Sequence, residues 1–287
     1  MERRTILKSM IAGAGLAISP LSSALSAVKT KSPRREANSG LDDAYLQDYL
    51  EKIRNFDKPH HNDLFLDQQN FRVLKSTVER FQRLQLVVGH GNFSLMSFDE
   101  ALKTARNNLR VGDFSAEEIT FLERVFYSTA SDYGFLGQKP FNKLTERIPT
   151  KEVVKVPQSG NFLYQGEPRS LFLKIRADLG DNVVLTSGIR SVVKQFLLFL
   201  DKAYQSNGNL SMASRSLAPP GYSYHGVGDF DVGQADFGHF NFTERFVTTE
   251  VFQRLREEGY LTLRYPRDNM LGVRFEPWHI RVGELRV

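Results

Sequence analysis

Apolar residues recur at three- and four-residue spacing through the first half of the chain, from Leu41 to about Arg147. The clearest series are Tyr45, Leu46, Tyr49, Leu50 and Ile53, followed by Phe71, Leu74, Val78, Phe81 and Leu84. This spacing places one apolar stripe along an α-helix. Capping-box sequences begin at Ser97 and Ser115, each with Glu three residues later, and predict two further helix starts. Residues 41–149 are therefore predicted to form a mainly helical region.

The pattern changes after Pro149. Short apolar or β-branched runs predict strands at 153–156, 161–164, 183–186, 229–232, 273–275 and 280–282. Longer apolar-periodic stretches predict helices at 170–179 and 191–204. No repeating βαβ unit is visible, which favours an α+β fold: a small antiparallel sheet with flanking helices, at 150–287, preceded by the helical region.

The first 27 residues have the three-part pattern of an export signal. A short basic start precedes an apolar stretch from Met10 to Ile18, and small residues that offer processing points follow. The stretch is too short for a stable membrane span. Arg3 and Arg4 make the start resemble a twin-arginine signal, although Glu2 stands where Ser or Thr is usual. We expect an exported, periplasmic protein that meets the twin-arginine machinery; the alternative is an amphipathic N-terminal helix of a cytosolic protein.

Composition narrows the possible partners. The chain has 38 Lys and Arg against 33 Asp and Glu, and no Cys. Residues 1–27 hold three basic side chains and one acidic one, and the predicted linker 28–40 holds four and one, so the remainder is formally neutral. This removes the main support for a nucleic-acid partner. Without Cys, any metal site must use His and carboxylates, and only six His are present.

Two polar clusters in the second half suggest metal chemistry. In one, Glu276 precedes His279 by three residues, and Pro277 between them can bend the chain so that the two side chains converge. In the other, glycines surround His225, and Asp229 and Asp231 alternate with an apolar residue and so share one face of a strand. Two His and one Asp leave a fourth zinc position for water, and the glutamate can accept the proton of that water.

Simpler interpretations stay open for single residues. Alone, the segment around His279 could be an edge strand with a structural Trp. His60 and His61 follow a proline in a polar turn and fit solvated loop histidines better than metal ligands. Asp236 and His239, in a glycine-flanked segment, are weaker candidates for a metal site.

Three separated motifs strengthen the metal hypothesis. They are Thr186-Ser-Gly-Ile-Arg-Ser191 with Gln195, Ser223-x-His225-x-x-Gly228, and Glu276-x-Trp278-His279. In this order they resemble the signatures of the VanY-type zinc D,D-carboxypeptidases, a group that also includes lysostaphin-like peptidases and the zinc domain of hedgehog proteins. The resemblance covers about residues 150–287.

The resemblance implies roles for individual residues. His225, an Asp and His279 would bind Zn²⁺, and Glu276 would be the general base. Arg190 would hold the terminal carboxylate of the peptide, assisted by Ser223, and Gln195 would also belong to the substrate site. The family places its Asp seven residues after the first His. Here Asp231 is six and Asp229 four residues after His225, so a one-residue shortening favours Asp231. Asp229 is then either the alternative ligand or a support for one of the histidines.

By this likeness the chain would remove the C-terminal D-Ala from peptidoglycan stem peptides. An L,D-carboxypeptidase or an endopeptidase on the same scaffold remains an alternative, because stereochemistry depends on pocket shape. A zinc-containing module that binds wall peptide without cutting it is a further alternative, although such a module has no need of Glu276.

Overall fold

The computed structural model describes residues 43–283, so the predicted export signal 1–27 and linker 28–40 lie outside the described residues. Five helices come first: α1 Asp43–Arg54, α2 Gln68–Val88, α3 His90–Leu95, α4 Phe98–Asn107 and α5 Ala116–Tyr127. Both predicted capping boxes are present, at Ser97 with Glu100 and at Ser115 with Glu118. In each box the serine hydroxyl accepts from the glutamate N–H, and the glutamate carboxylate accepts from the serine N–H. The helical first region is confirmed.

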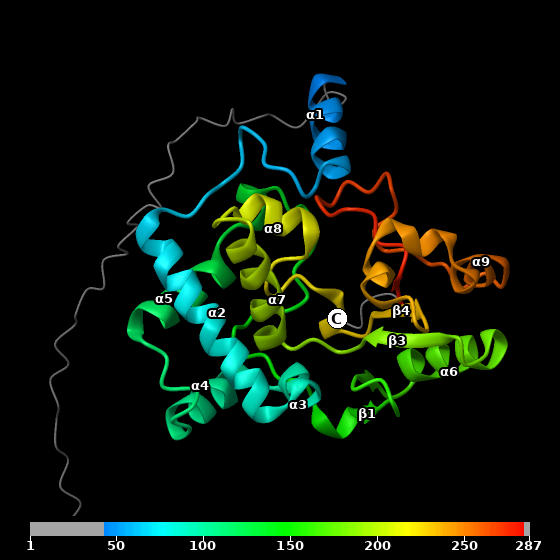
Figure 1. Cartoon of the computed structure of the whole chain (residues 1–287), viewed down its shortest axis with the longest axis horizontal. Coiled ribbons are helices and arrows are strands. Elements are labelled where there is room, and N and C mark those ends of the chain that lie inside the picture. Colours follow the sequence, from blue (N-terminus) through cyan, green and yellow to red (C-terminus); the bar gives the residue numbers. More distant parts are fainter. Residues whose placement is uncertain (1–42, 284–287) are drawn as a thin grey trace, which may run out of the picture. The chain divides into compact units, whose positions relative to one another are not determined.

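The later part mixes helices with two small antiparallel sheets (Figure 1). Its strands are β1 Val153–Lys155, β2 Phe162–Tyr164, β3 Val183–Ser187, β4 Phe230–Gln234 and β5 His279–Ile280. Its helices are α6 Glu167–Leu179, α7 Val192–Gln205, α8 Leu210–Ser216 and α9 Glu250–Glu257. Single-turn 3₁₀ helices lie at η1 Ala130–Tyr133, η2 Thr150–Glu152, η3 Tyr224–Gly226, η4 Gly238–Phe242 and η5 Glu244–Thr248. This arrangement confirms the predicted mixture of helices with antiparallel strands, although the strands form two small sheets and not the single one predicted.

The core consists of two clusters of buried apolar side chains. One is built around α7, which packs against α2, α3, α4 and α8; the Phe81 and Phe196 rings stack 6.1 Å apart within it. It joins side chains from both sides of residue 149. The other fills the space where α6 and α9 cover β3 and β4 (Figure 1). The first cluster thus holds α7 firmly, and α7 begins beside the residues of the predicted site.

The predicted strand at 273–275 is wrong. The segment pairs with no strand: Arg274 N–H donates to the carbonyl of Arg215 at the end of α8, and the N–H of Glu276, just after the segment, donates to the Tyr265 carbonyl in a loop. The strand predicted at 280–282 is instead β5, which begins at His279 and ends one residue later. No helix within residues 43–283 has the length and apolar character needed to cross a membrane.

A buried ion pair fixes the segment before α2. Arg215 of α8 donates two hydrogen bonds to Asp63, at 2.6 and 2.9 Å, and Asn209 donates a third at 2.7 Å. Both charged side chains are almost fully buried. Burial alone would raise the pKa of Asp63, but the bonds from Arg215, Asn209 and the His60 N–H outweigh it, so the pKa is lowered.

Asp63→Asn is expected to destabilise the fold by about 3–5 kcal/mol at neutral pH, because Arg215 keeps a buried charge without a partner. The folded pKa of Asp63 lies below its ordinary value of 3.8, so its stabilisation is complete above that value and is lost as pH falls through the folded pKa. Urea unfolding should therefore show a large gap between wild type and variant at pH 7 that narrows toward about pH 3. Asp113→Asn, at an exposed pair with Arg106, is the control and should cost about 1 kcal/mol or less. A constant gap would contradict the assignment.

Candidate active site

Three antiparallel strands bring the predicted site residues together. Asp231 lies in the central strand β4, opposite Ser187 of β3 on one side and His279 of β5 on the other. Because side chains directly across a ladder point to the same face, the Asp231 carboxylate and the His279 imidazole meet. The pairing thus joins two residues that are 48 positions apart in the chain.

His225 enters from the 3₁₀ turn η3, just before β4. Its Nδ1–H donates to the Gly188 carbonyl at 2.8 Å, which leaves Nε2 as the free nitrogen. A Cβ on Gly188 would lie 2.0 Å from the Phe162 carbonyl oxygen, so only glycine allows this approach. Burial, together with the nearby Arg190 charge, lowers the pKa of His225 and favours the neutral ring. A neutral imidazole with a free Nε2 is the form that binds metal ions.

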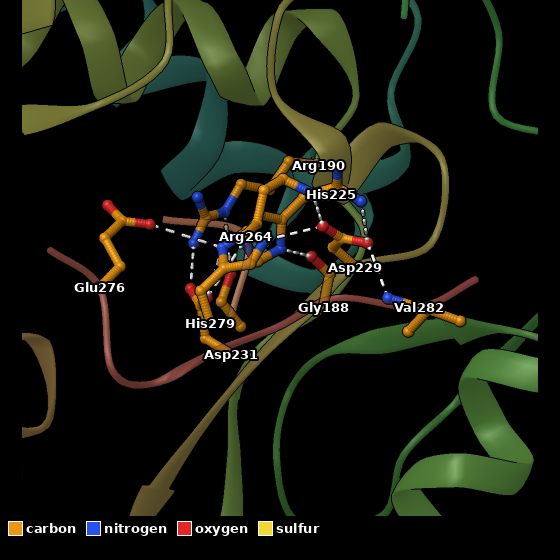
Figure 2. A network of polar contacts seen from close by, with 10 residues as sticks. Gly188, Arg190, His225, Asp229, Asp231, Arg264, Glu276, His279 and Val282 are labelled. Atoms are coloured by element: carbon orange, nitrogen blue, oxygen red, sulfur yellow. Dashed lines mark hydrogen bonds and ion pairs between the residues drawn. The ribbon is translucent and has the colours of Figure 1, made fainter. Parts of the chain in front are cut away.

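His225, Asp231 and His279 present one donor atom each to a common point (Figure 2). Asp231 Oδ1 lies 3.2 Å from His225 Nε2 and 3.3 Å from His279 Nδ1, and the three donor atoms all lie within 4.8 Å of one another. His225 Nε2 and Asp231 Oδ1 are buried and have no hydrogen-bond partner among the described residues. Orphaned nitrogen and oxygen donors with a shared focus suit a metal ion, and two imidazoles with one carboxylate suit Zn²⁺.

The opposite edge of His279 is held by Asp229. Asp229 Oδ2 lies 2.9 Å from His279 Nε2, and the same carboxylate accepts from Arg264 and, at 3.0 Å, from the Val282 N–H (Figure 2). These bonds outweigh burial and lower the pKa of Asp229 to about 2. A carboxylate on the far nitrogen fixes the ring so that Nδ1 faces the donor group, which is the usual support for a metal-binding histidine. Asp229 therefore supports His279, while Asp231 belongs to the three-donor group.

His279 is surrounded by acidic groups. Burial alone would lower its pKa, but the hydrogen bond to Asp229 and the nearby carboxylates of Asp231 and Glu276 outweigh it and raise the pKa well above the ordinary value. For Asp231 the balance has the opposite sign: burial would raise its pKa, but His225 and Arg190 beside the carboxylate lower the pKa well below the ordinary value. The site thus favours an ionised aspartate and positive charge beside it.

Glu276 reaches the site through a tight turn. The His279 N–H donates to the Glu276 carbonyl at 3.2 Å, with Pro277 and Trp278 between them, which is the bend that the sequence predicted at Pro277. The turn places Glu276 Oε2 3.5 Å from His279 Nδ1 (Figure 2). Glu276 is largely buried, yet it also lines a cavity of about 20 Å³ above the donor atoms, which has room for about one water. A carboxylate beside such a water is placed to accept its proton.

Arg190 lies at the end of β3, before α7. Its Nη2 donates to Asp231 Oδ2 at 2.5 Å and its Nε to the Ser187 hydroxyl at 2.9 Å. Its Nη1 makes no hydrogen bond within residues 43–283. Since Arg190 also lines the small cavity, it both holds the free oxygen of Asp231 in place and keeps one donor available for a ligand.

Ser223 and Gln195 line the same cavity as Arg190. The Gln195 amide is bonded at both ends: Nε2 donates to the Arg190 carbonyl at 2.9 Å, and Oε1 accepts from the Gly221 N–H at 2.8 Å. Gln195 therefore fastens the loop that carries Ser223 and His225 to the start of α7. A part for Gln195 in substrate binding stays a prediction.

Sequence reasoning missed two residues of the site. Arg264 clamps Asp229, and its guanidinium lies 3.5 Å above the Tyr224 ring. Tyr265 is almost fully buried, lines the small cavity, and its ring lies 5.2 Å from that of His279. Burial chiefly, with the Glu276 charge, raises the pKa of the Tyr265 phenol. Both lie in an irregular segment that contains no recognisable motif. Residue spacing therefore could not predict that they belong to the site.

The weaker metal candidates lie outside the three-donor group. Within residues 43–283, His60, His61, Asp236 and His239 take no part in that group. His61 is exposed, and the His239 ring packs against Phe240 with 4.0 Å between ring centroids.

The segment that contains this geometry matches a known family. Residues 169–283 match the family model described as VanY, D-alanyl-D-alanine carboxypeptidase. This segment is therefore similar to the VanY family. The match begins inside α6 and includes every residue of the donor group, together with Glu276, Arg190, Ser223 and Gln195. None of the curated proteins matches the chain.

Solved structures similar to the chain include two of VanY-type enzymes. One is a glutamate-to-alanine mutant of the vancomycin-resistance D,D-pentapeptidase VanY from a VanB-type cassette, in complex with Zn(II). It is 24% identical in sequence, the match covers 52% of this chain and 88% of that chain, and the TM-score is 0.37. Another is VanYB in complex with D-alanine-D-alanine: 23% identity, 52% and 85% coverage, TM-score 0.40. A third is the LD-carboxypeptidase LdcB: 20% identity, 51% and 66% coverage, TM-score 0.36.

Proposed function

We propose that this protein is an exported, zinc-dependent D,D-carboxypeptidase that removes the C-terminal D-Ala from peptidoglycan stem peptides. The observation that carries the proposal is the convergence of His225, Asp231 and His279 beside Glu276, within the segment that matches the VanY family. The domain match supports a peptidase of this type, and the donor set supports Zn²⁺.

His225 Nε2, Asp231 Oδ1 and His279 Nδ1 would hold the zinc. When bound, the ion supplies Lewis-acid polarisation of the scissile carbonyl and lowers the pKa of a water molecule. The Gly188 carbonyl and Asp229 orient the two imidazoles, and Arg190 orients Asp231 through its second oxygen. Each ligand is therefore aligned before the ion binds, which supports tight and specific metal binding.

Glu276 would act as the general base and then as the general acid. Its carboxylate faces the donor atoms across the small cavity, where it can take the proton of the attacking water and pass it to the departing amine. The free Nη1 of Arg190 and the Ser223 hydroxyl would bind the terminal carboxylate of the peptide. Recognition of that carboxylate favours removal of one residue from the end of the peptide over cleavage within it.

The test is mass spectrometry of pentapeptide-containing muropeptides after incubation with the zinc-loaded protein. Loss of one terminal D-Ala is expected, together with no further shortening of the tetrapeptide product. Tripeptide would instead indicate L,D-carboxypeptidase activity, and cleaved cross-links would indicate an endopeptidase. Unchanged muropeptides that still bind to the protein would contradict an enzymatic role.

A further inference from the structure

A larger chamber adjoins the small cavity of the site. Its volume is about 430 Å³, which is within the range of small-molecule binding pockets. The two spaces share the side chains of Arg190, Leu198, Leu217 and Glu276. A peptide whose terminal carboxylate lies at Arg190 and Ser223 can therefore continue into this chamber with the residues that precede the scissile bond.

The chamber wall carries three cationic side chains and two carboxylates. Arg190 and Asp231 are paired with each other, and Glu276 faces the metal donors. The charges that remain are Lys194 and Arg274. Both lie outside the predicted metal and substrate residues, so the proposed chemistry leaves them unexplained.

Arg274 has an unpartnered polar atom. Its Nε is buried, with no hydrogen-bond partner among residues 43–283. The guanidinium lies over two rings, 4.7 Å from the centroid of Phe56 and 4.8 Å from that of Trp278. Stacking occupies the faces of the guanidinium plane and leaves its N–H edge for an anion, and a carboxylate matches that edge. The buried Nε–H without a hydrogen-bond partner carries a desolvation cost, which an anionic ligand would offset.

Lys194 adds a second, partly buried cation. It lies in the first turn of α7, and its Nζ donates to Gln85 Oε1 at 2.8 Å. An ammonium has three donors, so the remaining ones can reach a ligand. Burial, together with the Arg190 charge, lowers the pKa of Lys194 to about 8, which leaves it mostly protonated at neutral pH. An anion in the chamber would offset both the burial of the Lys194 ammonium and its repulsion by Arg190.

We propose that the chamber binds a carboxylate that the substrate carries upstream of the scissile bond, and that Arg274 and Lys194 hold it. This inference rests on the proposed function and narrows its substrate class to peptides that are acidic on the acyl side. His90 and Ser94 of α3 also line the chamber, so the helical first region contributes to the substrate site.

A carboxylate of this kind can have two sources. One is the side chain of the residue before D-Ala-D-Ala, and the other is the free α-carboxylate of a γ-linked glutamate one residue earlier. The first is tested with N-acetylated tripeptides Xaa-D-Ala-D-Ala, in which Xaa is aminopimelate, its side-chain amide or lysine. The second is tested with the lysine peptide extended by γ-linked D-glutamate, with its α-carboxyl group either free or amidated.

For the zinc-loaded wild type, kcat/KM is expected to be about tenfold to a hundredfold higher for the free carboxylate than for the matched amide, in at least one of the two series. Arg274→Gln and Lys194→Gln should each lower this ratio, because each removes a charged donor. Lys194→Arg keeps the charge and should retain most of the preference. Lys103→Gln, at an exposed lysine on α4, is the control and should keep the whole ratio.

Equal kcat/KM for carboxylate and amide peptides in both series would overturn the inference and leave the carboxypeptidase function intact. A wild-type preference that persists in both glutamine variants would overturn the assignment to Arg274 and Lys194. The wild-type protein alone tests the preference for a carboxylate, so this test remains valid even if a substitution prevents folding. Calorimetric binding of the same peptides to zinc-loaded Glu276→Gln tests the chamber without turnover; failure of the proposed hydrolysis alone would leave that binding preference in place.

Discussion

Glu276→Gln is expected to lower kcat by about 10²–10⁴-fold while the protein still binds zinc. The amide keeps the size of the side chain but cannot accept the proton of a water. Glu276 is not one of the three donors that converge, so its replacement leaves His225, Asp231 and His279 in place. The measurements are release of D-Ala from a pentapeptide and elemental analysis of zinc in the same purified sample.

The matched control is Glu244→Gln, which neutralises an exposed glutamate that pairs with Arg267 at the surface. It should keep both zinc and turnover near wild-type levels. The assignment of Glu276 as the base fails if the Glu276→Gln protein hydrolyses peptide within a few-fold of the wild-type rate. Loss of zinc in that variant would instead show that Glu276 belongs to the metal-binding group.

Local patterns predicted most of the fold. The capping boxes at Ser97 and Ser115 are satisfied inside their own first turns, so neighbouring residues alone determine those helix starts. The hairpin of β1 and β2 is likewise local. The failed strand at 273–275 shows the limit of this approach. The backbone in and just after it bonds to the Arg215 and Tyr265 carbonyls, and no pattern within three residues reports such distant partners.

The same distinction applies to the site. His225, Glu276 and His279 stand in short motifs, so their chemistry could be predicted from residue types and spacing. The spacing favoured Asp231 over Asp229, and the strand register, which pairs Asp231 with His279, agrees with that preference. Arg264 and Arg274 carry no motif, because their roles arise from irregular chain that folds onto the site. The sequence thus indicated the groups proposed to react, and the structure adds Arg264 and Arg274, which carry no such signal.

That register leads to a paired test of the two aspartates. Asp231→Asn is expected to lose most of its zinc, since Asp231 Oδ1 lies beside His225 Nε2 and His279 Nδ1 and its charge balances the ion. Asp229→Asn should still bind zinc, with an affinity lower by about 10–100-fold, because it loosens the orientation of His279 without removing a donor. Zinc content is measured after dialysis of both proteins against the same series of chelator concentrations.

The two substitutions are chemically identical and lie two residues apart, but Asp231 faces His279 Nδ1 and Asp229 faces His279 Nε2. Near-ultraviolet circular dichroism before dialysis checks that both proteins have folded. The reverse order, with zinc lost from Asp229→Asn and kept by Asp231→Asn, would make Asp229 the ligand. It would also require His279 to bind through Nε2, the nitrogen that now faces Asp229. The order of zinc affinities therefore decides the ligand and the nitrogen together.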